Sequence, residues 1–282
     1  MASPPPPPEP PAEARPGPVP DYDVAGRRVL VTGASSGIGA GLAEALAAAG
    51  AVVGICARRA DRLAATLERC RVHAPASCSW VVDLADPAAV DRLAVEAVEA
   101  LGGVDILVNN AGIPLRRHAT KLDAATVEAV MAVNFLSPAR LTLALLPGMV
   151  ARGNGRIVNV SSVAAVLSSP GEAAYSASKA ALAVWSESLA VDLWETGVHT
   201  MTVYPGVVDT ELFTIPGNDP LLPGVDMIPV SEAVDAVLAG LATGALEVYV
   251  PGFFKDLASG KAANVEGFLA GTVEYVKAQR GG

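Results

Sequence analysis

The sequence predicts an α/β fold, with one doubly wound parallel sheet of about seven strands and helices on both faces of the sheet. From Arg27 onward, short runs rich in β-branched residues alternate with longer Ala- and Leu-rich segments of helical spacing. The short runs are continuously apolar, which is typical of strands covered on both faces. This alternation predicts parallel strands, whose ligands bind beyond the carboxyl ends.

Each expected strand is a short apolar run that a turn or a helical pattern follows. The strands are expected at 27–33, 51–57, 78–84, 104–110, 156–162, 198–206 and 246–251. The helices are expected at 38–49, 60–70, 87–101, 123–151, 172–195 and 231–243, the fourth of them broken by proline.

The chain divides into three parts by composition. Ten of its 22 prolines lie in the first twenty residues, so we expect residues 1–22 to be a disordered, Pro-rich lead. Residues 23–251 hold the alternating pattern and form one folded domain. Residues 252–282 form an extension that we expect to be partly helical, since apolar residues recur there at helical intervals.

Composition excludes several classes of function. A net charge of -9 without a clustered Lys/Arg face argues against a nucleic-acid partner. The three cysteines show no CxxC spacing and indicate reduced thiols, hence a cytoplasmic location, and the three scattered histidines form no metal site. No run reaches the roughly 18 uncharged apolar residues that a membrane span needs.

A glycine-rich turn, TGASSGIG (32–39), joins the first strand to the first helix. Gly33, Gly37 and Gly39 let the backbone pass close to a pyrophosphate, whose charge then meets the helix N-terminus. The spacing is GxxxGxG, which differs from the commonest dinucleotide fingerprint. A bare tight loop is the alternative, but the position between strand and helix favours a nucleotide.

The end of the second strand indicates which nucleotide. Ala57, Arg58 and Arg59 stand where an acidic residue would bind the ribose of NAD, and a guanidinium suits the 2′-phosphate of NADP. The alternative is that both arginines only solvate the start of a helix. Asp83, after the third strand, is placed to accept from an adenine amino group or to cap the strand end.

Tyr175 and Lys179 stand four residues apart in AAYSASKAAL, so both project from one helix face. Ser162, at the end of the fifth strand, lies at the same sheet edge and can reach the same substrate oxygen, although such serines are often plain turn residues. An ammonium about 5 Å away at an effective dielectric of about 20 stabilises a phenolate by roughly 3 kcal/mol. We therefore expect Lys179 to make Tyr175 more acidic.

Asn134 lies in the long fourth helix, four residues before Pro138. Pro138 has no N–H that could bond the carbonyl of Asn134, one helical turn earlier. This carbonyl is therefore open to an ordered water. A helix bend without a role is the alternative.

Taken in order, TGASSGIG, NNAG (109–112), YSASK and PGVVDT (205–210) resemble the motifs of the short-chain dehydrogenase/reductase family. The resemblance runs from about Arg27 to Pro251 and implies a Rossmann-like fold, which makes 23–251 an NAD(P)-binding catalytic domain. In that family the tyrosine is the acid/base, the lysine lowers its pKa and binds the nicotinamide ribose, and the serine orients the substrate oxygen. The asparagine holds a water through its backbone carbonyl. The resemblance thus implies the catalytic set Asn134, Ser162, Tyr175 and Lys179.

The resemblance also implies the residues that contact the cofactor. Asn110 is expected along the cofactor, Val208 and Thr210 near its carboxamide and Asp83 at its adenine, and a strand ending in Ala-Arg is the NADP-preferring variant. The full expected set is Gly33, Ser35, Ser36, Gly37, Ile38, Gly39, Arg58, Arg59, Asp83, Leu84, Asn110, Tyr175, Lys179, Val208 and Thr210.

We therefore expect an oxidoreductase that transfers a hydride between NADP(H) and the carbonyl or secondary alcohol of a small molecule, without a metal. The irregular, apolar segment 210–229 favours a lid over a hydrophobic substrate, although its apolar residues can equally pack beneath the lid. A catalytically silent nucleotide sensor and a scaffold acting through the Pro-rich lead stay open. The resemblance implies a homodimer or homotetramer. The C-terminal extension is expected to pack on its own domain, on a neighbouring subunit or on a membrane surface, in that order.

Overall fold

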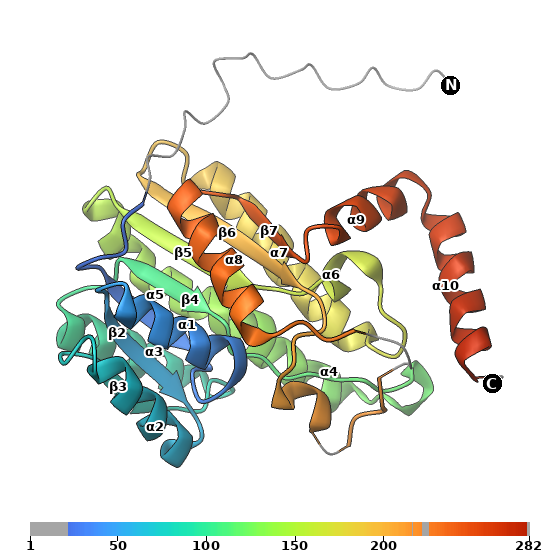
Figure 1. The fold of residues 1–282 in the computed structure, drawn as a ribbon, viewed down its shortest axis with the longest axis horizontal. Helices are drawn as coiled ribbons and strands as arrows, with labels where there is room; N and C mark the ends of the chain where they lie inside the picture. Colours follow the sequence, from blue (N-terminus) through green and yellow to red (C-terminus); the bar gives the residue numbers. More distant parts are fainter. Residues whose placement is uncertain (1–21, 216, 222–225, 281–282) are drawn as a thin grey trace.

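The computed structural model describes residues 22–215, 217–221 and 226–280. Within these ranges one parallel sheet has the strand order β3-β2-β1-β4-β5-β6-β7 (Figure 1). The strands are β1 (Arg28–Thr32), β2 (Val52–Ala57), β3 (Cys78–Val81), β4 (Ile106–Asn109), β5 (Gly155–Val160), β6 (Val198–Pro205) and β7 (Glu247–Val250). The predicted fold class is confirmed, and the predicted lead lies outside the described residues except for Tyr22.

Helices connect successive strands and cover both faces of the sheet (Figure 1). They are α1 (Gly37–Ala48), α2 (Ala60–Arg71), α3 (Pro87–Leu101), α4 (Ala124–Met131), α5 (Ser137–Ala151), α6 (Ala164–Leu167), α7 (Ala173–Asp192), α8 (Val230–Thr243), α9 (Phe254–Ala263) and α10 (Val265–Arg280). Short 3₁₀ turns, η2 (Ala119–Lys121) and η4 (Glu211–Thr214), follow β4 and β6. The C-terminal extension is therefore more helical than expected.

Alternate residues of β1 point to opposite faces, and each face has its own apolar core. Val29 and Val31 pack with α1, α2 and α8, whereas Leu30 packs with α3, α5 and α7. Because both faces are covered, the strands need continuous apolar sequence, which is the pattern that predicted them. β1 lies between β2 and β4, so the chain reverses its winding direction there, and a ligand site is expected beyond the carboxyl end of β1.

Helix α3 shows how local sequence sets an element's limits. Asp86 is the N-cap, its side chain accepts a hydrogen bond from the Ala88 N–H at 2.9 Å, and Pro87 occupies the first helical position. Gly102 ends the helix with a left-handed φ of 71°, a conformation that glycine adopts without strain.

The predicted helix 123–151 is continuous but contains a π-helical turn, η3 (Ala132–Leu136), between α4 and α5. Pro138 lies in the first turn of α5, directly after the π-helical turn, and Pro147 lies inside α5, so the regular α-helix is interrupted before Pro138 but continues through Pro147. The stretch Ala124–Ala151 is long and apolar enough to cross a membrane by composition, with a hydropathy of 1.6. Half of that window is buried in the fold, where Leu141 and Leu145 belong to the core, so the stretch is weak support for a span.

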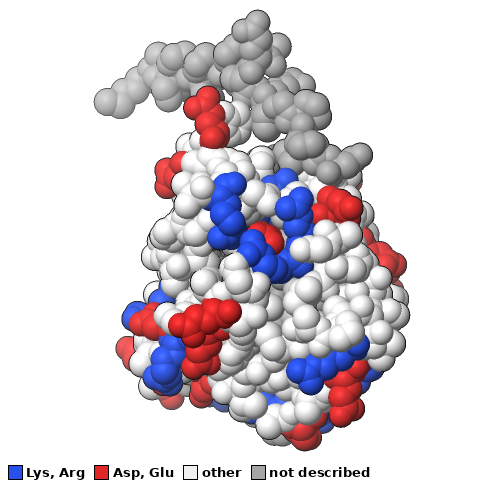
Figure 2. Space-filling view, turned by 90° about the vertical axis from the view of Figure 1, so that its left-hand side faces the viewer, with Lys and Arg blue, Asp and Glu red and all other residues white. Residues whose placement is uncertain are grey.

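Surface charge is mixed in sign on the side shown in Figure 2. Lys and Arg side chains gather there in one small area around acidic atoms, and large areas between the charges are uncharged. This face therefore carries no extended basic surface of the kind that nucleic-acid binding needs.

Candidate active site

One large cavity opens beyond the carboxyl ends of the central strands. It brings together the glycine-rich turn after β1, the loops after β2 to β6 and the N-terminal part of α7. All of the residues predicted for the site line this cavity except Gly39 and Asn134. Whether each of them has its predicted role stays a prediction.

The glycine-rich turn is packed tightly against the loop after β4. Gly33 has a φ of +69°, and a Cβ there would lie 2.7 Å from the Cα of Ala111, so only glycine fits. Asn110 Nδ2 donates to the Thr32 carbonyl at 2.9 Å and so ties the two loops together. Gly39 packs inside this contact, because a Cβ there would lie 2.6 Å from the Gly33 carbonyl oxygen.

The N-terminus of α1 is suited to a phosphate. Its N-cap, Ser36, makes no side-chain capping hydrogen bond, and the first turn holds no acidic residue. The first N–H groups of a helix have no partner within it and attract anions. Since Ser35, Ser36 and Gly37 line the cavity here, the residues present fit the pyrophosphate of a dinucleotide.

Arg58 and Arg59 line the cavity beside this turn, as predicted. Arg59 donates to Ser36 Oγ at 2.6 Å and pairs with Glu211 Oε2 at 2.7 Å. Arg62, on α2, binds the other oxygen of Glu211. These hydrogen bonds lower the pKa of Glu211 to about 2, so this carboxylate after β6 is ionised beside the predicted ribose site.

Asp83 and Leu84 follow β3 and line the end of the cavity beside Arg58 and Val82. Asp83 Oδ1 accepts from the Ala85 N–H at 3.0 Å, which is the turn-capping role that the sequence left open. One carboxylate oxygen of Asp83 thus shapes the loop, while the residue lines the cavity.

Tyr175, Ser162 and Lys179 meet on the far side of the cavity from the glycine-rich turn. Ser162 lies close enough to hydrogen-bond the Tyr175 phenol. Lys179 Nζ lies 5.9 Å from the centre of the Tyr175 ring and donates to the Val160 carbonyl at 2.8 Å. Lys179 is 3% exposed, and burial lowers the pKa of its ammonium to about 8.

The electrostatics of Tyr175 follow mainly from its burial. Burial raises its pKa and the charge of Glu172 raises it further, while the hydrogen bond with Ser162 and the charge of Arg116 oppose the rise. Loss of hydration thus outweighs the attraction of Arg116, and acidification of Tyr175 by Lys179 beside a bound cofactor stays a prediction. The phenol is therefore protonated at neutral pH.

Asn134 is fully buried behind the cavity instead of lining it. Its Oδ1 accepts from the Ile113 N–H at 2.7 Å, and its Nδ2 donates to the Ile113 carbonyl at 3.1 Å. The side chain thus braces the loop after β4, and Ile113 carries this effect to the cavity wall. The water that the backbone carbonyl of Asn134 was expected to hold stays a prediction.

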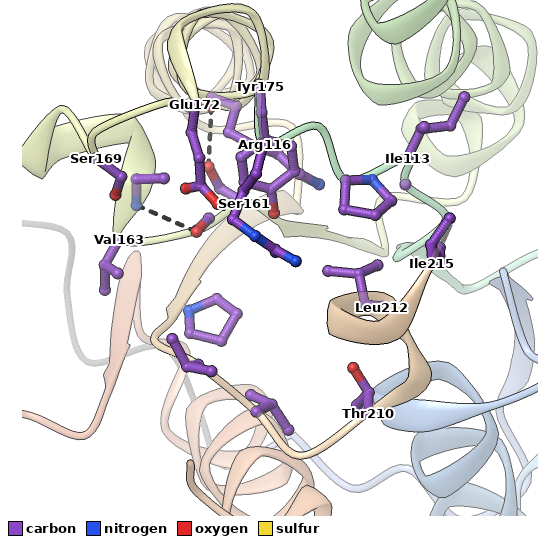
Figure 3. Close-up of a pocket in the computed structure, with 18 of the residues that line it drawn as sticks. Ile113, Arg116, Ser161, Val163, Ser169, Glu172, Tyr175, Thr210, Leu212 and Ile215 are labelled. Carbon is purple, nitrogen blue, oxygen red and sulfur yellow. Dashed lines mark hydrogen bonds and ion pairs between the residues drawn. The ribbon is translucent and has the colours of Figure 1, made fainter. Parts of the chain in front are cut away.

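Sequence reasoning missed an ion pair beside Tyr175. Arg116, in the loop after β4, lies 3.9 Å from Glu172, just before α7, and its guanidinium points into the cavity (Figure 3). Arg116 Nε also donates to the Asp219 carbonyl at 2.9 Å, which joins the segment after β6 to this site. The available signal was a carboxylate three residues before Tyr175, at the start of an otherwise Ala- and Ser-rich helix.

Within the described residues, no group of three or more His, Cys, Asp or Glu side chains could hold a metal ion.

A family model for the short chain dehydrogenases matches residues 27–217, well over half of the chain. The chain belongs to the short-chain dehydrogenase family. A fatty acyl-CoA reductase of Mycobacterium tuberculosis is 41% identical over 194 residues, which cover 67% of this chain and 66% of that protein. The matches to two further curated relatives cover 61% and 58% of the length of those proteins, so the chain spans less than two thirds of each of them.

Solved structures agree with this membership of the short-chain dehydrogenases. A short-chain dehydrogenase from Sphingobium yanoikuyae in complex with NADPH matches with a TM-score of 0.76 and 32% identity, over 85% of this chain and 94% of that one. A family member from Burkholderia phymatum in complex with NAD shares the fold, with a TM-score of 0.78 and 24% identity over 87% and 96% of the chains. The solved relative of 32% identity thus binds NADPH, and the curated relative of 41% identity is a reductase by name, which favours chemistry over the catalytically silent alternative.

Proposed function

We propose that this short-chain dehydrogenase reduces the carbonyl group of an apolar small molecule, or oxidises the corresponding alcohol, with NADP(H) as its preferred cofactor. One observation carries the proposal: the glycine-rich turn, Arg58 and Tyr175 line the same cavity. A dinucleotide held by its phosphates at the N-terminus of α1 can extend to the phenol that handles the proton.

The chain's own residues supply the proton and hold the reacting oxygen. Bound NADPH would supply the hydride that forms the new C–H bond at the carbonyl carbon. Tyr175 donates a proton to the carbonyl oxygen as negative charge develops there, and Ser162 hydrogen-bonds the same oxygen. Lys179 backs the phenol from the next turn of α7, and Asn134 is proposed to support reprotonation of Tyr175 through a water.

The protonated state of Tyr175 at neutral pH supports reduction as the favoured direction. A protonated phenol can donate at once, whereas oxidation of an alcohol first requires the phenol to lose its proton. Burial is the main cause of the raised pKa, and it makes loss of that proton harder.

Preference for NADP(H) rests on the end of β2. Arg58 and Arg59 line the cavity directly after β2, and β2 itself does not end in the acidic residue that would bind an unmodified ribose. The neighbour solved with NADPH is 32% identical in sequence to this chain, which supports this choice. A guanidinium pair would hold the 2′-phosphate by charge-assisted hydrogen bonds.

The apolar substrate is supported by the cavity wall beyond Tyr175. Leu212 and Ile215, from the segment after β6, face the catalytic side of the cavity from across it (Figure 3). The fatty acyl-CoA reductase among the relatives supports an acyl-derived substrate. We also propose a cytoplasmic homodimer or homotetramer, as the resemblance implied; the molar mass in solution tests the assembly.

The decisive experiment measures oxidation of NADPH and NADH by the purified protein with butanal, octanal and dodecanal. Tyr175→Phe removes only one hydroxyl and should lower kcat/KM at least about 100-fold, the usual range for loss of a general acid. Tyr249→Phe is the matched control, since Tyr249 stacks on Tyr204 away from the cavity. Equal rates for wild type and Tyr175→Phe would remove Tyr175 from the mechanism, and a preference for NADH would overturn the cofactor assignment.

A further inference from the structure

The last helix, α10, presents one apolar face to the same cavity as Tyr175. Leu269, Val273 and Val276 line the cavity and follow one another at intervals of four and three residues, so they share one face of the helix. Leu269 is 42% exposed and Val273 51% exposed, so the fold leaves this face without a packed cover. The face lies beyond residues 27–217, which the family model matches.

Helix α10 is attached to the rim of the active site through α9. Lys261, on α9, donates to the Val166 carbonyl at 2.6 Å and to Ser168 Oγ at 2.7 Å, at the end of α6. Helix α6 begins two residues after Ser162, so the same short segment connects the catalytic serine to the base of the C-terminal arm. Figure 1 shows α10 held out from the sheet and joined to the body through α9.

A second apolar wall comes from the segment that follows β6. Leu212, Ile215 and Leu221 line the cavity with α10, and this segment is tied to the catalytic side of the site through the hydrogen bond from Arg116 to the Asp219 carbonyl. Polar groups in the cavity include Tyr175, Ser162 and the Arg116–Glu172 pair. The two apolar walls can therefore receive the part of a ligand that has no polar atoms.

The size of the cavity leaves room for more than one occupant. Its volume is about 1190 Å³, whereas a pocket for a single small ligand usually measures about 300–1,000 Å³. Part of the volume lies beside the glycine-rich turn, where the cofactor is proposed. The remainder, beyond Tyr175, reaches α10.

We propose that the apolar face of α10, opposite the segment after β6, is a binding site for the extended aliphatic chain of the substrate. The carbonyl lies at Tyr175, and the chain continues between the two apolar walls. The site selects long-chain over short-chain carbonyl compounds, because each methylene that leaves water for this wall favours binding. Only the position of the reacting carbonyl rests on the proposed function.

The test compares kcat/KM for butanal, octanal and dodecanal in the wild type and in two variants of the same chain, Val273→Asp and Val265→Asp. In the wild type, kcat/KM should rise about three- to fourfold for each methylene that becomes buried. Val273→Asp places a charge on the wall and should abolish this rise with chain length. Val265→Asp is the matched control, because Val265 lies on the same helix, is 48% exposed and does not line the cavity.

A second measurement keeps the test separate from catalysis. Titration calorimetry measures the Kd for decan-1-ol, which needs no turnover of an aldehyde. This Kd should rise at least about tenfold in Val273→Asp and stay unchanged in Val265→Asp. Loss of all turnover with this binding difference intact would overturn the proposed function alone. If Val273→Asp does not fold, as judged by circular dichroism, Val273→Ser gives the same comparison with a smaller effect.

Two other occupants of the α10 face would overturn the inference. If Val273→Asp lowers the molar mass in light scattering but keeps the preference for dodecanal, the face binds a second copy of the chain. If it abolishes binding to phosphatidylcholine/phosphatidylglycerol vesicles with the preference unchanged, the face binds a lipid surface. Equal chain-length profiles in Val273→Asp and Val265→Asp would likewise exclude a chain-binding site.

Discussion

The Glu172 carboxylate lies 3.9 Å from the Arg116 guanidinium, at the N-terminal end of the helix that carries Tyr175. The two charges act on the Tyr175 phenol in opposite directions: Glu172 raises its pKa and Arg116 lowers it. Burial raises the pKa of Glu172 itself to about 7, against the opposing charge of Arg116. The charge next to Tyr175 therefore changes within the physiological pH range.

Glu172→Gln should make alcohol oxidation possible at lower pH. The substitution removes the negative charge that raises the pKa of Tyr175, so the phenolate that oxidation requires forms more readily. The measurement is kcat/KM for oxidation of dodecan-2-ol against pH, where the rising limb should move to lower pH. Glu96→Gln, on the exposed side of α3, is the control; an unmoved limb would show that Glu172 does not act on Tyr175.

Arg116→Gln should move the rising limb of the pH profile for alcohol oxidation to higher pH. Loss of the guanidinium removes a charge that lowers the pKa of Tyr175, so oxidation then requires higher pH. Arg116→Lys keeps the charge but loses the hydrogen bond from Nε to the Asp219 carbonyl. This second variant should keep the position of the limb and raise KM, which separates the electrostatic effect from positioning of the segment after β6. A common shift in both variants would contradict this assignment.

Lys179→Met should stabilise the protein while it inactivates it. Burial lowers the pKa of Lys179 from 10.5 to about 8. At neutral pH the charged ammonium therefore has a higher free energy in the native state than in the unfolded state, which lowers the stability of the fold. Between about pH 8 and 10.5 only the unfolded state keeps that proton, and wild-type stability should rise with pH there. Urea unfolding at pH 7 should show a gain of about 1–3 kcal/mol. Lys121→Met is the exposed control, and a less stable Lys179→Met protein would refute the prediction.

Asp105→Asn should destabilise the amino end of the sheet. Burial by itself would raise the pKa of Asp105, but the hydrogen bonds and charge of Arg28, with the charge of Arg152, hold the pKa below its usual value. Arg28 Nη2 lies 2.5 Å from the carboxylate, and removing one partner of a buried pair costs about 3–5 kcal/mol.

The stabilisation by Asp105 should be present above the unfolded-state pKa and disappear as pH falls through the lower native value. Urea unfolding at neutral and at acid pH checks this, and the difference between wild type and Asp105→Asn should vanish in acid. Asp91→Asn, which breaks the exposed pair with Arg140, should change stability little at either pH. A difference between wild type and Asp105→Asn that is equal at both pH values would contradict the electrostatic origin.

Glu211→Gln should strengthen binding of NADPH and leave NADH unaffected. Glu211 stays ionised at physiological pH and engages Arg59 and Arg62, so it competes with a 2′-phosphate for the same guanidinium groups. The Arg59 and Glu211 side chains are about half exposed and screened by water, so the Kd for NADPH should fall only about two- to fivefold. Fluorescence titration with both cofactors checks this, with Glu232→Gln as the control, and equal effects on NADPH and NADH would contradict it.

Much of the fold followed from the sequence because its signals are local. The run of apolar residues in β1 predicts a strand covered on both faces, and Val29 and Leu30 do reach different cores. The prediction of β3 was three residues too long, because Val82 and Leu84 continue the apolar run in the sequence but belong to the loop. Proline at 138 was expected to break a helix, and a π-helical turn interrupts the α-helix just before it.

Spacing along one element also determined part of the site. Tyr175 and Lys179 share a helix face because they stand four residues apart, and the glycine-rich turn lies at a helix N-terminus because it directly precedes α1. Such relationships depend on backbone geometry over a few residues, so the sequence alone determines them.

Tertiary structure decided everything that depends on burial or on distant segments. Arg116 and Glu172 are 56 residues apart and meet only because the loops after β4 and before α7 fold over one cavity. The pKa of Tyr175 rises because hydration is lost when the whole domain closes around it, which no local pattern records. The apolar spacing of Leu269 and Val273 predicted a helix but not the direction it faces. Packing of α9 against α6 sets that direction and brings the helix to the active site.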